Sequence, residues 1–276
     1  MRLYKTDAIV LSDSELGDQD KIITLLSPRY GKIRAVAKGA RRLKSRFAPA
    51  MQMLSYVTAV LYKSRRIEVD TFNECKINSS FLGIRNELIR LAYGYCFVEL
   101  IMKFVHGAET PPFLFNLLLK TLFLLEKIPK KSLPVLMRSF ELRMLTILGY
   151  RPYLAGCVEC HRKVEKERQV YFSGYEGGIL CSNCSKEKTG KLVSFKTIQW
   201  MKFLRTVSLD KLATVKVAPK VDEELKVIPE SYIPHRLGEE ILSYSFIERV
   251  QALETEVETA KKTSSPSTET RVSWID

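Results

Sequence analysis

The chain has 276 residues, of which 46% are hydrophobic and 27% are charged, an ordinary composition for a folded protein of two or three modules. The first residues lack the apolar segment of a secretory signal, and the most apolar run, residues 112–125, is too short to span a bilayer. Composition therefore argues against secreted and membrane-spanning classes and predicts a cytoplasmic protein. The formal net charge of +13 points to a polyanionic partner.

Almost all of this positive charge lies in one short window. Between Lys21 and Ile67 there is no Asp or Glu, and twelve Lys and Arg carry +12 of the +13. The cations are Lys21, Arg29, Lys32, Arg34, Lys38, Arg41, Arg42, Lys44, Arg46, Lys63, Arg65 and Arg66. A solvated face without a partner is the plainer interpretation. However, charges this dense repel one another and weaken a fold unless an anion offsets them, so we favour a phosphate-binding surface.

The same region predicts a small β domain over residues 1–79. In residues 31–38, apolar and cationic side chains alternate with the period of a strand, and the loop that follows concentrates four more cations. Five strands in about 75 residues are typical of a small barrel or sandwich, and a five-stranded barrel with a binding face matches the charges best. The expected strands are 4–11, 20–26, 31–38, 51–62 and 67–77, with an acidic turn at 12–19.

From Ser80 the apolar spacing becomes helical, which predicts an α-helical domain over residues 80–254 and an α+β multidomain chain. Ser132 and Ser194 are candidate N-caps, and Gly149 is a candidate helix terminator. Cys96 falls on the apolar side of the first helix and is expected in the core. The expected helices are 88–105, 113–127, 133–148, 195–207 and 233–254, with a polar loop at 212–231 and a disordered tail at 255–276.

Four of the six cysteines form two CxxC pairs, Cys157 with Cys160 and Cys181 with Cys184, separated by twenty residues. Each two-residue gap lets both thiolates of a pair face one ion, and two pairs complete a tetrahedron. We therefore expect one structural zinc ion in a ribbon inserted at about 151–190, with a hairpin formed by 169–173 and 178–180. Redox-active pairs or an iron–sulfur cluster are the alternatives. His161 is taken as a bystander because four thiolates already close the site.

The sequence contains no recognisable catalytic constellation. Its three histidines lie in separate segments, and no phosphate loop, dinucleotide-binding or metalloprotease motif is present. Residues 13–20 contain four carboxylates, Asp13, Glu15, Asp18 and Asp20. They could hold Mg²⁺ for a nuclease, but a polar turn beside the cationic surface is the favoured interpretation. The sequence predicts a binding protein rather than an enzyme.

The order of the parts resembles the RecO family of bacterial recombination mediators. Lys5–Leu11 with Asp18–Ile22 looks like that family's opening strands, and Gly39–Arg42 with Lys44–Arg46 resembles its basic loop. Phe140–Leu154 running into Cys157 and Cys160 carries the likeness further, and Arg236–Ser243 looks like its last helix. The likeness covers roughly residues 1–250. One departure is His161, where a glycine is expected after the second cysteine.

The resemblance implies an OB-fold barrel in a DNA repair protein without enzymatic turnover, acting in the bacterial cytoplasm at the nucleoid. Such proteins bind single- and double-stranded DNA, anneal complementary strands without ATP, and act with RecR to help load RecA onto strands coated by single-strand-binding protein. A zinc-ribbon RNA-binding or transcription-associated protein is the alternative. The expected DNA-binding residues are Lys32, Arg34, Lys38, Arg41, Arg42, Lys44, Arg46, Lys63, Arg65 and Arg66.

Two further groups of residues have open assignments. Tyr30, Phe47, Tyr56 and Tyr62 lie among the charges and either stack on bases or fill the barrel, and we expect Tyr56 in the core. In the family, the acidic, apolar-ended tail of single-strand-binding protein docks on the helical domain. Arg138 and Arg143 are the candidates for that contact, and surface arginines with packed stems are the alternative.

Overall fold

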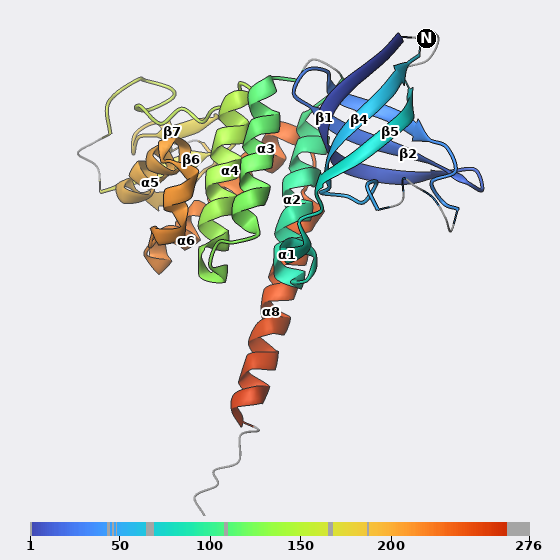
Figure 1. Ribbon diagram of the computed structural model, residues 1–276. Helices are drawn as coiled ribbons and strands as arrows, with labels where there is room; N and C mark the ends of the chain where they lie inside the picture. The colour runs from blue at the N-terminus through green and yellow to red at the C-terminus, as the bar shows by residue number, and fades with distance from the viewer. Residues whose placement is uncertain are drawn as a thin grey trace, which may run out of the picture.

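The computed structural model describes residues 2–42, 45, 47, 49–64, 69–107, 110–164, 168–186 and 188–263. A β-barrel lies at one end of the molecule, and helices α2, α3 and α4 lie in the middle of the molecule (Figure 1). The small sheet that contains β6 and β7 lies on the other side of these helices from the barrel. None of the described helices is long and apolar enough to cross a bilayer.

Five strands form a closed barrel in the order β1-β2-β3-β5-β4. Neighbouring strands are antiparallel except β3 and β5, which pair in parallel through Ala35 with Asp70 and Val36 with Thr71. The interior is filled by inward-facing residues such as Val10, Leu25 and Phe72. The strands are β1 Arg2–Leu16, β2 Asp20–Ser27, β3 Gly31–Ala37, β4 Tyr56–Lys63 and β5 Asp70–Ser79.

Strand β1 is buried on both of its faces near its middle. Arg2–Ile9 pair with β4, Ile9–Leu16 pair with β2, and the register with β2 shifts between Val10 and Ser12. Val10 faces the barrel interior, whereas Ile9 and Leu11 pack against the helices. This is why the sequence shows a continuous apolar run there, because a strand covered on both sides has no polar face.

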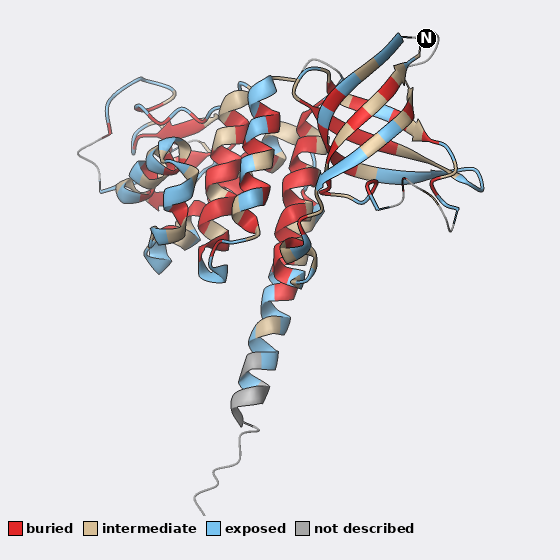
Figure 2. Ribbon diagram, in the orientation of Figure 1, coloured by how far each residue is buried: buried red, intermediate tan, exposed pale blue. Residues whose placement is uncertain are grey.

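The helical part surrounds one large apolar core that also includes the outer face of β1. Figure 2 shows buried residues along the inner sides of α2, α3 and α4 and exposed residues along the far part of α8. The α-helices are α1 Leu82–Arg85, α2 Leu88–Phe104, α3 Pro112–Leu125, α4 Leu133–Ile147, α5 Phe195–Thr206, α6 Pro219–Leu225, α7 Ile233–Leu237 and α8 Leu242–Thr263. The 3₁₀-helices are η1 Lys130–Ser132 and η2 Leu209–Thr214, and η3 Ile228–Tyr232 is a π-helix.

Several predicted boundaries are confirmed. Ser194 accepts a hydrogen bond from the Thr197 backbone N–H and caps α5 as expected. Gly149 follows α4 with a φ of +85°, which glycine adopts readily. Cys96 is fully buried in the core. The predicted hairpin is β6 Gln169–Ser173 with β7 Gly178–Leu180, and β8 Lys191–Ser194 adds a third strand.

Other predicted segments differ. Residues 12–16, expected in a turn, belong to β1, and residues 51–55, expected in a strand, form turns before β4. The expected loop 212–231 contains α6 and two short turns with buried apolar residues. The expected helix 233–254 is broken at Gly238, and α8 continues to Thr263, so residues 255–263 are helical rather than disordered. Residues 264–276 lie outside the described part.

Candidate nucleic-acid interface and metal centre

The outer face of β3 carries exposed cations, as the alternating pattern predicts. Ile33, Ala35 and Ala37 are buried in the barrel, whereas Arg34 and Lys38 are exposed. Lys63 is exposed at the end of β4, where it pairs with Arg2 of β1. These side chains extend from a closed barrel, so the strands fix where each cation emerges.

Lys32 lies on the same face of β3, but its ammonium already binds other groups of the protein. Its ammonium donates hydrogen bonds to the backbone carbonyls of Val105 and, at 3.3 Å, Met102, at the C-terminal end of α2. A cation is favoured there because the last carbonyls of a helix have no intrahelical partner and carry partial negative charge. Burial lowers the pKa of Lys32. In contrast to the sequence expectation, this lysine joins the barrel to the helical domain.

The loop after β3 is fastened to the turn between β1 and β2. The Arg41 backbone N–H donates to Gln19 at 3.0 Å, and the Arg41 guanidinium donates to the Gly17 carbonyl at 3.0 Å. The Arg42 Nε donates to the Gln19 side chain at 2.7 Å. Both guanidinium groups stay exposed. Two loops distant in sequence therefore form one cationic rim beside β3.

The carboxylates of residues 13–20 are distributed along this rim. Glu15 forms an ion pair with Arg41 at 3.1 Å, Asp13 pairs with Lys21, and the Asp20 carboxylate accepts a hydrogen bond from the Gly39 N–H at 2.7 Å. Within the described chain, the only acidic, histidine or cysteine side chains close enough to share a metal ion are the four cysteines. The carboxylates thus offset nearby cations, which favours the polar-turn interpretation over a Mg²⁺ site.

The remaining predicted DNA contacts and aromatic residues are placed as follows. Lys44, Arg46, Arg65 and Arg66 lie outside the described residues. Phe47 is buried in the barrel, with its ring 6.2 Å from Phe72. Tyr56 is half-buried and packs on Phe115 of α3, with ring centroids 6.3 Å apart. Tyr30 is half-buried and packs on Tyr4, with ring centroids 4.5 Å apart, so Phe47, Tyr56 and Tyr30 all pack against protein. Tyr62 is half-buried.

The four ribbon cysteines converge on one point. The sulfur atoms of Cys157, Cys160, Cys181 and Cys184 all lie within 4.8 Å of one another, and Cys160 Sγ is 3.8 Å from Cys181 Sγ. A tetrahedral zinc ion with bonds of about 2.3 Å separates its sulfur ligands by about 3.8 Å. The cluster therefore fits zinc and leaves no coordination position for a substrate.

Backbone geometry prepares this cluster for a cation. Burial raises the pKa of the Cys157 thiol, but hydrogen bonds from the backbone N–H groups of Cys160, Cys181 and Glu159 bring that pKa down to about 7. His161 has a φ of +59°, the left-handed conformation for which glycine is best suited, and this explains why a glycine is expected at this position. Its ring is exposed and lies edge-on to Tyr153, 6.3 Å away, as expected for a bystander.

Arg138 and Arg143, predicted as one partner-binding pair, occupy different sites. Half-buried Arg138 forms an ion pair with the fully buried Glu141, with a nitrogen–oxygen distance of 2.6 Å, and Tyr244 donates to the same carboxylate at 2.7 Å. Arg143 donates to Ser139 at 3.0 Å and to the Val207 carbonyl, and it lines a groove. The structure therefore pairs Arg138 with the buried Glu141 beside a second cavity, and it places Arg143 in the groove next to α3.

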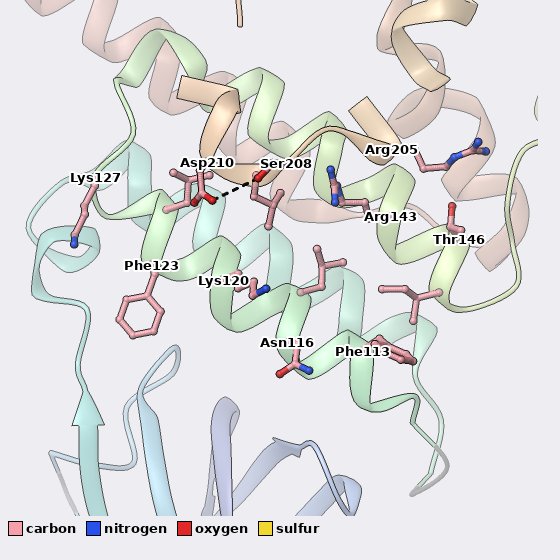
Figure 3. A pocket seen from close by; sticks show the side chains of 14 residues that line it. Phe113, Asn116, Lys120, Phe123, Lys127, Arg143, Thr146, Arg205, Ser208 and Asp210 are labelled. Atoms are coloured by element: carbon pink, nitrogen blue, oxygen red, sulfur yellow. Dashed lines mark hydrogen bonds between the residues drawn. The ribbon is translucent and has the colours of Figure 1, made fainter. Parts of the chain in front are cut away.

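This groove, of about 790 Å³, lies between α3, α4 and the segment after α5 (Figure 3). Phe113 and Phe123 of α3 are 72% and 42% exposed along it. Lys120, Lys127 and Arg205 add positive charge. The Arg205 Nη1 atom is buried without a hydrogen-bond partner in the described structure. Sequence reasoning missed these residues, although the spacing of Phe113, Lys120, Phe123 and Lys127 marks one face of a helix.

Comparison with known proteins assigns both halves of the chain. Residues 1–81 match the family model for the recombination protein O N terminal, and residues 85–245 match the model for its C terminal. The chain is 34% identical to DNA repair protein RecO of Symbiobacterium thermophilum over 254 residues, covering 91% of this chain and 99% of the relative. It is 32% identical to that of Acetivibrio thermocellus, covering 92% and 99%. The chain belongs to the RecO family of DNA repair proteins.

Proposed function

We propose that this protein is a recombination mediator that binds single- and double-stranded DNA and anneals complementary strands without ATP. With RecR, it would help load RecA onto strands coated by single-strand-binding protein. Family membership supports the repair role. The observation that carries the proposal is the row of exposed cations on β3 and the neighbouring rim, Arg34, Lys38, Arg41 and Arg42.

The barrel is proposed to be of the OB type. The strand order β1-β2-β3-β5-β4 and the single parallel pairing between β3 and β5 support this assignment. In such barrels, one strand face and the adjoining loops bind oligonucleotides. The exposed face of β3 and the rim formed by Arg41 and Arg42 lie where that contact is expected.

Cations placed this way suit annealing. Two complementary strands repel each other through their phosphates, and a cationic surface reduces this repulsion while releasing condensed counterions. Lys63 is proposed to extend the face along β4. Lys44, Arg46, Arg65 and Arg66 remain DNA-contact proposals that rest on their sequence position.

The test is annealing of two complementary oligonucleotides across a salt series, with and without RecR and single-strand-binding protein. Replacing Arg34, Lys38, Arg41 and Arg42 together by Gln should reduce the slope of log K against log salt on single strands by about 2–3. A matched control replaces four exposed lysines of the helical domain by Gln, Lys131, Lys211, Lys216 and Lys220. If the two variants reduce the salt slope equally, the cations of β3 and the rim are not the DNA-binding face. Preference for one specific duplex without annealing would favour the transcription-associated alternative.

The four-cysteine cluster is proposed to hold one structural zinc ion. The thiolate donor set and the sulfur spacing support zinc. Bound there, the metal would fix the two turns that flank the hairpin of β6 and β7. The purified protein should contain one zinc ion per chain, and absence of stoichiometric metal would reject this assignment.

The groove of Figure 3 is proposed to bind the acidic, apolar-ended tail of single-strand-binding protein. Exposed phenylalanines beside Lys120, Lys127 and Arg143 suit a segment that combines apolar and anionic groups. Half-buried Arg205, whose Nη1 atom is buried without a hydrogen-bond partner in the described structure, supports an anion at that end of the groove because an unpaired buried donor is costly.

A tail peptide tests the groove. Arg143→Ala alone is ambiguous, because Arg143 also holds Ser139 and Val207. Lys120→Ala removes an exposed cation instead, and Lys131→Ala is its matched control outside the groove. We expect Lys120→Ala to raise the Kd for the peptide severalfold, by the roughly 1 kcal/mol of a partly screened charge contact. An unchanged Kd in both Lys120→Ala and Arg205→Ala would reject the groove.

A further inference from the structure

Three tyrosines in the C-terminal half present unusually exposed rings. Tyr150 and Tyr153 lie in the segment that leaves α4 and are 43% and 40% exposed. Tyr175, in the turn between β6 and β7, is 67% exposed. Aromatic rings are normally buried for much of their area, so rings held in solvent at neighbouring positions mark a contact surface.

Backbone hydrogen bonds fix the position of Tyr153 beside the hairpin. The Tyr153 N–H donates to the Gly177 carbonyl at 2.9 Å, and the Tyr153 carbonyl accepts from Ile179 at 3.1 Å, so this segment is tied to the hairpin. Gly178 approaches so closely that a Cβ there would lie 2.3 Å from the Tyr153 carbonyl oxygen. A pre-organised ring loses little conformational entropy when a ligand stacks on it.

Cationic groups lie among the rings. The Tyr175 ring packs on His235 with centroids 4.9 Å apart. The neighbouring Arg236 lies over Tyr232, and its buried Nε has no hydrogen-bond partner among the described residues. Arg151, between Tyr150 and Tyr153 in sequence, is exposed. Alternating aromatic and cationic groups suit a chain of bases and phosphates.

These residues begin next to the barrel. The Tyr150 ring lies 5.5 Å from Phe104 at the C-terminal end of α2, the same helix end that receives Lys32 of β3. From there the segment leads to the hairpin, which lies across the helical layer from the barrel (Figure 1). Tyr150 therefore lies beside the helix end that Lys32 contacts, and Tyr153 lies beside the hairpin.

We propose that Tyr150, Tyr153 and Tyr175 form a stacking track that continues a single strand of nucleic acid from the barrel to the hairpin of β6 and β7. Arg151 and Arg236 contact its phosphates. The track rests on the proposed function, because the barrel must hold the same strand. A polyanion is favoured over a protein segment because cations accompany the rings at both ends of the track.

The experiment compares two oligothymidylates. One of about 8 nucleotides fits on the barrel alone, and one of about 24 exceeds the roughly 4–16 nucleotides that such a barrel covers. The double variant Tyr153→Leu with Tyr175→Leu should raise the Kd of the long strand at least about tenfold and leave the short strand within about twofold. Phenylalanine at both positions should restore binding of the long strand. Phe203→Leu, which removes a ring that is 43% exposed on α5 and lies outside both proposed binding sites, is the control.

Each outcome separates the track from the function on which it rests. Unchanged binding of the long strand by the leucine variant, with the parent binding both strands, overturns the track and leaves the proposed function intact. Equal weakening of both strands also overturns it, because the rings would then act through the fold. Failure of the parent to bind either strand rejects the proposed function itself. If the leucine variant binds DNA as the parent does but loses binding to a protein partner, the rings belong to a protein-binding surface, which likewise overturns the track.

Discussion

Lys32 and Arg34 are adjacent cations on one strand with opposite expected roles. Lys32→Gln removes two hydrogen bonds from a charged donor to the carbonyls that end α2. Bonds to charged groups are worth about 1.5–3 kcal/mol, and partial exposure reduces this to about 1–2 kcal/mol. Arg34→Gln removes an exposed guanidinium, and Arg34 forms no ion pair in the described structure. We therefore expect Lys32→Gln to lower stability and Arg34→Gln to lower DNA affinity.

Two measurements separate these effects. The melting midpoint of Lys32→Gln should fall by roughly 2–8 °C, whereas that of Arg34→Gln should stay within about 1–2 °C of the parent. The slope of log K against log salt on a single strand should become shallower by about 0.7 in Arg34→Gln and remain unchanged in Lys32→Gln. If Lys32→Gln changes the salt slope as much as Arg34→Gln does, the lysine contacts phosphate and its assignment to α2 is wrong.

Two other predictions concern the remaining parts of the fold. Chelation or Cys181→Ser should destabilise the ribbon by several kcal/mol, exposing residues 151–194 to protease while the barrel stays resistant, and loss of both parts together would contradict a separate metal module. Burial raises the pKa of Glu99, but hydrogen bonds from the Ser243 hydroxyl and from the Ser243 and Leu242 N–H groups at the start of α8 lower it overall. This contribution to stability is therefore present above the unfolded pKa of about 4.3 and lost as pH falls through the folded value. Glu99→Gln should be less stable than the parent at pH 7, with the difference shrinking below about pH 4, and a constant difference would contradict the assignment.

The N-terminal strands could be predicted from the sequence wherever one face of the strand is buried in the core and the other is exposed to solvent. Residues 31–37 keep a period of two, and β3 has the expected bounds almost residue for residue. Residues 12–16 have no apolar face because this end of β1 is exposed, and a polar segment of this kind predicts a turn. Only pairing with β2 makes these residues a strand, and pairing is a long-range property that a local pattern does not record.

The C-terminal segments were harder because their helices are short. Leu212, Val221, Leu225 and Ile228 are all buried, but they belong to separate elements of six residues, seven residues and five residues. No single helical period runs through them, and the polar residues between them resemble a loop. The break at Gly238 was readable in principle, since a glycine with a φ of +74° ends a helix.

The metal cluster and the partner site show what residue spacing can and cannot specify. Two CxxC pairs constrain four side chains to one ion, so spacing alone located the cluster. Arg138 and Arg143 are five residues apart on α4, which at 3.6 residues per turn places them about 140° apart around the helix. They therefore face different surroundings, a buried carboxylate for Arg138 and an open groove for Arg143.

The density of cations predicts a binding face on the barrel, but several of these cations already have partners within the protein. Lys32 is bound to helix carbonyls, Lys21 to Asp13, and Arg41 shares its charge with Glu15. Because an ammonium held by carbonyls must break those bonds before it can contact phosphate, its contribution to binding is reduced by their free energy. Arg34 on β3 and Lys38 directly after it are exposed, and they should therefore contribute more per charge than the partnered cations. If the slope of log K against log salt matches the number of exposed cations alone, it supports this ranking of the cations. A slope that corresponds to all twelve cations would refute it.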